Sequence, residues 1–94
     1  MDIVFEIIDK TGRKIRLTKT QWSHIRMRHS GVDESEIQET LKNPQRVIEE
    51  DNNVIIFYRY YKERKESEKY LKLMVKYLNG DGYVITSYFV RNML

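Results

Sequence analysis

The fold of this chain is decided by residues 70–90, which read YLKLMVKYLNGDGYVITSYFV. Apolar residues alternate with polar ones before the glycines, and β-branched and aromatic residues follow them. This pattern is typical of two half-buried strands joined by a turn. We therefore predict a β-hairpin with strands over 70–78 and 83–90 and a three-residue loop over 80–82.

The register of this hairpin predicts which side chains share a face of the sheet. A loop over 80–82 places Lys76 opposite Thr86, and Met74 opposite Tyr88. Side chains alternate across a strand, so these four residues lie on one face, which presents a lysine, a hydroxyl and a phenol. The other face is more apolar, and we expect helices to cover it. It carries Leu71, Leu73, Val75, Tyr77, Ile85, Ser87 and Phe89.

The residues before this hairpin predict four more strands and two helices. Thr18 or Thr20 can cap the first helix, and Asp33 with Glu36 forms a capping box for the second. Pro44, after Asn43, stops the second helix. The strands are expected over 2–9, 14–17, 45–50 and 54–61, and the helices over about 18–29 and 33–42.

The order of these elements predicts the fold class. A β-hairpin and two helices come first, and an antiparallel meander follows, which is typical of α+β domains. We predict one domain over 1–94, in which an N-terminal β-hairpin and two helices pack on a four-stranded antiparallel sheet. A chain of 94 residues, of which 40% are hydrophobic, can build one modest core.

The composition excludes several classes of protein. The chain has no cysteine, so disulfides and thiolate metal sites are excluded and a cytoplasmic location is expected. No run approaches the roughly 20 apolar residues of a membrane span, and residues 1–6 lack the plan of a signal peptide. The two histidines lie five residues apart and do not share a helix face, and no Asp or Glu nearby completes a metal-binding triad, so neither a metal nor another cofactor is expected.

Basic residues gather in one segment, residues 10–32. Seven Lys or Arg and both histidines fall within it, and it contains no acid, in a chain whose net charge is +3. Such a segment focuses a positive potential and attracts polyanions, whereas a single lysine on its own is usually just a solvated side chain. The segment as a whole therefore predicts anion binding.

Both histidines lie in the predicted first helix, with two arginines between them. Histidine exchanges protons near neutral pH, and arginine is a permanent cation that holds phosphate. His24 and Arg28 are i, i+4 neighbours on one face of this helix. His29 falls instead on the stripe of Trp22 and Ile25, at the helix end. We therefore expect His24 to face solvent or a ligand, whereas His29 also suits a buried structural role.

Five short pieces of this chain resemble one known group of proteins. They are His24-Ile25, Arg28-His29, Asn43-Pro44, Val75-Lys76 and the closing strand over 84–88. Together they resemble the phage-type barnase–EndoU–colicin–RelE-like nucleases over about residues 14–90. The resemblance implies the small α+β ribonuclease fold of that group and metal-independent RNA cleavage, often by a toxin or a phage-associated nuclease. It implies RNA as the substrate and, for a toxin, an antitoxin or immunity protein as the partner.

The resemblance also assigns roles to residues. That group works with a helical histidine, a strand lysine or arginine, and a hydroxyl with an aromatic residue on the last strand. These catalytic roles fall on His24 or His29, on Lys76, and on Thr86 with Tyr88. Arginine and tyrosine residues of the first helix and of the strand over 54–61 are expected to bind the substrate by charge and by stacking. They are Arg26, Arg28, Arg59 and Tyr61.

Two other interpretations fit the same residues. A non-catalytic RNA- or protein-binding domain of this fold accounts for the basic helix and the Arg/Tyr-rich strands, but not for the pair of histidines. A small toxin-like domain that acts on a protein is the third class. One residue also departs from the nuclease pattern, since Ser87 stands where that group usually has a small apolar residue. Cleavage of labelled RNA in the presence of EDTA separates the enzyme from both alternatives.

Overall fold

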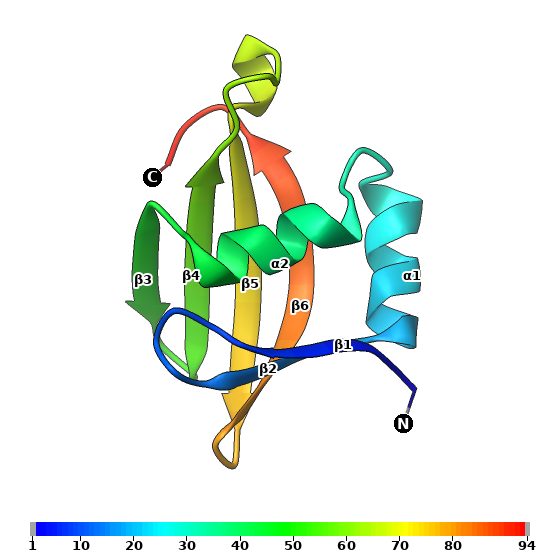
Figure 1. Ribbon diagram of the computed structural model, residues 1–94, viewed down its shortest axis with the longest axis vertical. Helices are drawn as coiled ribbons and strands as arrows, with labels where there is room; N and C mark the ends of the chain where they lie inside the picture. The colour runs from blue at the N-terminus through cyan, green and yellow to red at the C-terminus, as the bar shows by residue number, and fades with distance from the viewer. Residues whose placement is uncertain (1, 94) are drawn as a thin grey trace.

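A six-stranded sheet forms the body of the computed structural model, which describes residues 2–93 (Figure 1). Two helices, α1 (Lys19–Arg28) and α2 (Glu34–Lys42), and a short 3₁₀ turn, η1 (Glu66–Glu68), complete the fold. The prediction of an α+β fold with an N-terminal β-hairpin and two helices on a sheet is confirmed. The strands are β1 (Ile3–Ile8), β2 (Lys14–Thr18), β3 (Arg46–Glu50), β4 (Val54–Tyr60), β5 (Tyr70–Leu78) and β6 (Asp81–Val90), and their order in the sheet is β1-β2-β6-β5-β4-β3.

The sheet has six strands rather than the predicted four, and it is mixed rather than antiparallel. The N-terminal hairpin extends the meander because β2 pairs parallel with β6, Ile15 beside Gly82. Gly82 makes this close approach possible: a Cβ atom there would lie 2.8 Å from the ring of Tyr77 and 3.1 Å from Val75. Ile15 fills that space and is fully buried. The alternation of apolar and polar residues along a strand does not predict which distant strand pairs with it. The pairing of β2 with β6 was therefore not predicted.

The core lies between the sheet and α2, which crosses β4 and β5 in Figure 1. Ile37 and Leu41 are spaced i, i+4 on α2 and both are fully buried. The predicted capping box holds the start of this helix: Ser35 donates its backbone N–H to the Asp33 side chain, and Asp33 donates its own to Glu36. The predicted apolar face of β5 is therefore the one that helices cover. Among residues 2–93, no helix is long and apolar enough to cross a membrane.

The register predicted for the β5–β6 hairpin is wrong. The turn has two residues, Asn79 and Gly80, whose φ angles of 55° and 85° suit a two-residue hairpin turn. Lys76 therefore lies opposite Tyr83 rather than opposite Thr86. The Asn-Gly pair is the strongest short hairpin signal in a sequence, and it prevails over the three-residue loop that the following glycine suggested.

A β-bulge at Ile85 then restores the predicted grouping of side chains on β6. Val75 pairs with Val84, but Met74 pairs with Thr86, so Ile85 is left over. Without this extra residue, Thr86 would lie on the helix-covered face. With it, Thr86 shares the open face of the sheet with Met74, and Val84 takes the buried place predicted for Ile85.

Candidate active site

A shallow pocket of about 360 Å³ lies between α1 and β6, the two elements at the right of Figure 1. Four of the five predicted catalytic residues line it, His24 and His29 from the helix side and Thr86 and Tyr88 from the strand. Arg28 lines it as well. We call it the histidine pocket. Two segments far apart in the sequence thus bring two proton carriers, a fixed cation and two hydroxyls to one surface.

Local contacts fix α1 against β6. Thr18 caps the helix, since its side chain accepts a hydrogen bond from the Gln21 backbone N–H at 3.1 Å. The Gln21 side chain donates in turn to the carbonyl of Ile85, the bulged residue. Ile25 is buried one turn further along. The bulge that turns Thr86 toward the open face therefore also anchors the helix that carries His24.

His29 lies where α1 ends, and both histidines line the same pocket. The helix ends at Arg28, and the His29 backbone N–H donates to the Ile25 carbonyl at 2.7 Å. The φ angle of His29 is −138°, so the backbone leaves the helical path at this residue. The His29 ring then stacks on Tyr88, with 4.9 Å between centroids and 28° between planes. Regular helical phasing predicted separate faces for the two histidines, and the change of backbone direction at the C-cap overrides it. His24 is exposed, whereas His29 is half-buried.

The lysine beside this pocket is Lys72, not Lys76. Lys72 pairs opposite Tyr88, and its ammonium lies 5.7 Å from the centroid of the Tyr88 ring. Lys76 lies four residues along β5, about 13 Å away at the usual rise of a strand, opposite Tyr83. Sequence reasoning missed Lys72 because it chose the wrong loop. The Asn79-Gly80 signal alone does not find it either, because Lys72 lies opposite Tyr88 only through the bulge at Ile85.

Three of the four predicted substrate-binding residues lie elsewhere. Arg26 is on the far side of α1, with its guanidinium 5.8 Å from the Trp22 ring. Arg59 donates to the Asn43 carbonyl at the end of α2. Tyr61 donates to the Glu36 carbonyl at 3.0 Å, and burial raises the pKa of its phenol. Arg59 and Tyr61 hold α2 in place, so only Arg28 remains at the pocket.

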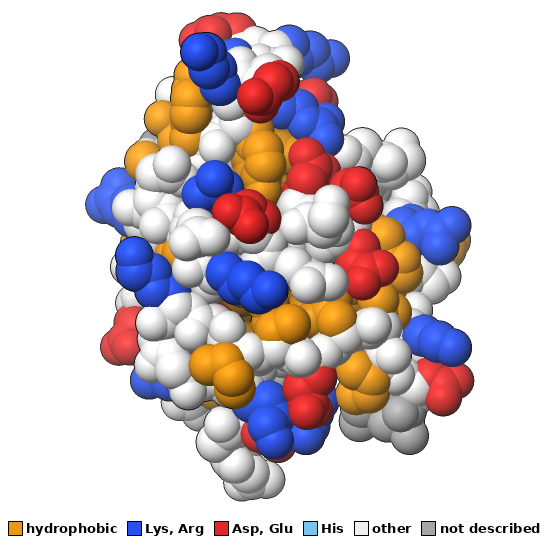
Figure 2. Space-filling view, in the orientation of Figure 1, with side chains coloured by type: hydrophobic (Ala, Val, Ile, Leu, Met, Phe, Trp, Pro, Cys, Tyr) orange, Lys and Arg blue, Asp and Glu red, His pale blue; other side chains and the backbone are white. Residues whose placement is uncertain are grey.

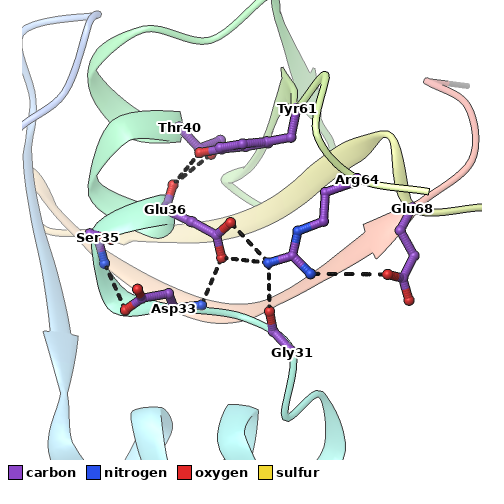
Figure 3. Close-up of polar contacts among 8 residues, drawn as sticks. All are labelled: Gly31, Asp33, Ser35, Glu36, Thr40, Tyr61, Arg64 and Glu68. Atoms are coloured by element: carbon purple, nitrogen blue, oxygen red, sulfur yellow. Dashed lines mark hydrogen bonds and ion pairs between the residues drawn. The ribbon is translucent and has the colours of Figure 1, made fainter. Parts of the chain in front are cut away.

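Arg64 holds the loop between β4 and β5 against the connection between the two helices (Figure 3). Its guanidinium donates to the Gly31 carbonyl at 2.9 Å and to both oxygens of Glu36 at 2.9 and 3.0 Å. It also lies 3.9 Å from the centroid of the Phe89 ring. No local sequence pattern predicts this residue, because its partners come from two distant segments, residues 31–36 and β6. The segment that follows His29 is thereby fixed.

The helix-covered face has a mixed distribution of charge. Figure 2 shows that acidic and basic side chains intermingle there, without a large area of one sign. Among residues 2–93, no three His, Asp or Glu side chains lie close enough together to hold a metal ion.

No family model, no curated protein and no solved structure matches this chain. The functional interpretation of the histidine pocket therefore rests on the residues that line it.

Proposed function

We propose that this protein is a metal-independent endoribonuclease whose active site is the histidine pocket. The observation that carries the proposal is that one pocket collects His24, His29, Arg28, Thr86 and Tyr88. The N-terminal hairpin and two helices on a sheet support the resemblance to the barnase–EndoU–colicin–RelE-like group. If the protein is a toxin of that group, an antitoxin or immunity protein is its expected partner.

The two histidines supply the proton transfers of the proposed reaction. One takes the proton from the 2′-hydroxyl of the RNA, and the 2′-oxygen attacks the adjacent phosphorus. The bond from phosphorus to the 5′-oxygen breaks, and the other histidine gives that oxygen a proton. The products are a 2′,3′-cyclic phosphate and a 5′-hydroxyl. Each proton-transfer partner typically accelerates such a step by about 10²–10⁴-fold.

The remaining side chains suit the charge that builds up on the phosphate. Arg28 and Lys72 are the cations near Tyr88. The Thr86 hydroxyl can donate to a phosphate oxygen. The Tyr88 ring stacks on His29 and lies near Lys72, so Tyr88 can orient the His29 imidazole.

The test is incubation of the purified protein with labelled single-stranded RNA in EDTA, with analysis of the product ends. We expect cleavage that leaves a cyclic phosphate, and a loss of at least 100-fold for His24→Ala. Arg26→Ala is the matched control, since Arg26 lies on the other side of the same helix. Absence of cleavage, or cleavage that stops in EDTA, would overturn the proposal.

One observation favours a second candidate, an RNA-binding domain without catalysis. Lys72 and Tyr88 pair directly across β5 and β6 on the open face of the sheet, and the exposed Tyr60 pairs with Tyr70 two residues away from Lys72 on the same face. Aromatic and cationic side chains in such a row can bind single-stranded RNA by stacking and charge. Salt-dependent RNA binding without any cleavage, unchanged by His24→Ala, would favour this candidate.

A further inference from the structure

The outer edge of β3 has no partner strand within residues 2–93. β3 is the last strand in the order of the sheet, and Figure 1 shows it at the left margin with no element beyond it. Its pairing with β4 is regular from Arg46 to Glu50, without a bulge. The opposite edge strand, β1, has a register shift between Ile3 and Phe5 and lies beside both helices. Bulges and covering elements protect a sheet edge, so β3 is the edge that can pair with another strand.

Alternate residues of β4 bond to the two strands beside it. The backbone N–H of Tyr61, just past the end of β4, donates to the Lys69 carbonyl at 2.7 Å, on the β5 side. The backbone N–H of Tyr60 donates to the Gln45 side chain at 2.7 Å, on the β3 side. Successive residues of an antiparallel strand direct their backbone groups to opposite edges. The even-numbered residues of β4 therefore bond to β3.

The backbone groups that β3 directs outward belong to Val47 and Glu49. The even-numbered residues of β4 pair with Arg46, Ile48 and Glu50, which thus use their own N–H and C=O groups on β4. The two residues between them direct these groups to the free edge. A further strand must therefore form its hydrogen bonds with Val47 and Glu49.

One symmetric antiparallel register pairs β3 with the β3 of a second copy along its whole length. It is centred on Ile48, which lies opposite Ile48 of the second copy. Val47 then lies opposite Glu49, so that both outward residues form hydrogen bonds. Arg46 lies opposite Glu50 at each end, in the kind of pair whose Cα atoms are about 4.5 Å apart. Opposite charges in such a pair stabilise the sheet.

The other symmetric registers match the charges less well. A register centred on Glu49 sets two glutamates opposite each other, and one centred on Val47 sets Arg46 opposite Ile48. Within residues 2–93, neither Arg46 nor Glu50 forms an ion pair, so both charges are available to a second copy. The strand is thus complementary to itself in one register.

We propose that two copies of this protein associate through β3 and join their sheets into one continuous sheet. Residues that lie opposite each other share a face, so the open faces of the two copies lie on the same side. The histidine pocket lies at β6, which β5 and β4 separate from the paired edge. The pocket therefore remains accessible in both copies, and the association does not depend on the proposed nuclease activity.

The experiment measures the association of wild type and of charge-reversal variants by sedimentation velocity over a range of protein concentrations. We expect wild type to dimerise reversibly. Arg46→Glu and Glu50→Arg should each weaken dimerisation by about tenfold or more, because two attractive pairs become repulsive. Arg26→Glu is the matched control, since Arg26 lies on α1, away from this edge, and it should dimerise like wild type.

An equimolar mixture of the Arg46→Glu and Glu50→Arg variants provides a second readout. In a mixed pair, the acids of one chain lie opposite the arginines of the other at both ends. We therefore expect a heterodimer, although each variant alone associates weakly, and its formation verifies that both variants are folded.

Three results would overturn the inference. They are a wild type that stays monomeric at millimolar concentration, a dimer that Arg46→Glu weakens no more than Arg26→Glu does, and a mixture without heterodimer. None of them bears on RNA cleavage, which is assayed separately and tests the proposed function alone.

Discussion

The two ends of the β5–β6 hairpin lie beside the same kinds of side chain, in opposite electrostatic settings. At the turn end, Arg16 meets Tyr83 and Asp81. At the pocket end, Lys72 lies near the Tyr88 ring, and Arg28 lines the same pocket as Tyr88. Both ends therefore combine cations with a tyrosine on one face of the sheet.

The cation at the turn end is already neutralised. Arg16 pairs with Glu6 and with Asp81, the latter at 3.0 Å, and donates to the Tyr83 hydroxyl at 3.2 Å. The hydrogen bonds to Glu6 and Tyr83, with the charge of Asp81, raise the pKa of Arg16 above its usual value. At the pocket end, neither Arg28 nor Lys72 forms an ion pair with a carboxylate of residues 2–93. Residue types alone do not predict an anion site. The positions of the acids decide it.

The largest effect is expected at the pocket end, from His24→Ala. The side chain is exposed, so its loss should leave the melting temperature nearly unchanged. Removal of a proton-transfer partner should lower the cleavage rate by about 100-fold or more. The measurement is the single-turnover rate on labelled RNA, with Arg26→Ala as control. A variant as active as wild type would exclude His24 from the reaction.

A comparison of Lys72→Ala with Lys76→Ala tests the two ends directly. Lys72 lies at the pocket, and Lys76 lies toward the turn opposite Tyr83. We expect Lys72→Ala to weaken RNA binding by about tenfold at low salt and Lys76→Ala by less than twofold, because the charge must be near the phosphate. Binding is measured by fluorescence anisotropy at several salt concentrations. If Lys76→Ala has the larger effect, the site is on the turn side of the sheet.

Gly82→Ala tests the turn end as a scaffold. The added Cβ meets Tyr77 and Val75 within 3.1 Å, where β2 joins β6. Overpacking of this kind typically costs about 1–3 kcal/mol, so we expect a lower midpoint in urea. RNA cleavage by the folded fraction should remain, since the histidine pocket lies at the other end. An unchanged midpoint would mean that β2 and β6 are not in this close contact.

The smallest effect concerns the alkaline limit of stability. Burial and the charge and hydrogen bond of Asp9 raise the pKa of Tyr77 to about 12, from 10.0 for an ordinary tyrosine. Between these values the unfolded chain loses this proton and the folded protein keeps it, so stability should fall as the pH rises from 10 to 12. Tyr77→Phe should show a shallower fall over that range in urea melts. Equal slopes for both proteins would contradict the assignment.

Much of the fold could be predicted from local sequence, because local chemistry decides it. The caps at Thr18 and Asp33, the buried pair of Ile37 and Leu41 and the strand pattern of β5 all depend on near neighbours. The parallel pairing of β2 with β6 does not: it depends on the missing Cβ of Gly82 and the fit of distant side chains.

For the candidate site, the sequence predicted the types of residue better than their positions. His24, Thr86 and Tyr88 line one pocket, and His29 lines it too, although helical phasing predicted another face for His29. The sequence predicted Lys76 at the pocket, where the structure has Lys72. A change of one residue in the length of the turn shifts every cross-strand pair of a hairpin, and a bulge leaves no reliable sequence signal. The role of Arg64 was not predicted because residues 62–69 read as an ordinary charged loop.

The most direct test of the account is an NMR titration with a 2′-O-methyl RNA oligonucleotide, which binds but lacks the attacking hydroxyl. The account predicts that the backbone signals of His24, Arg28 and Thr86 shift with the RNA, while those of Arg16 and Tyr83 at the turn end stay in place. Shifts confined to Arg16 and Tyr83, or no shifts at all, would contradict a phosphate site in the histidine pocket.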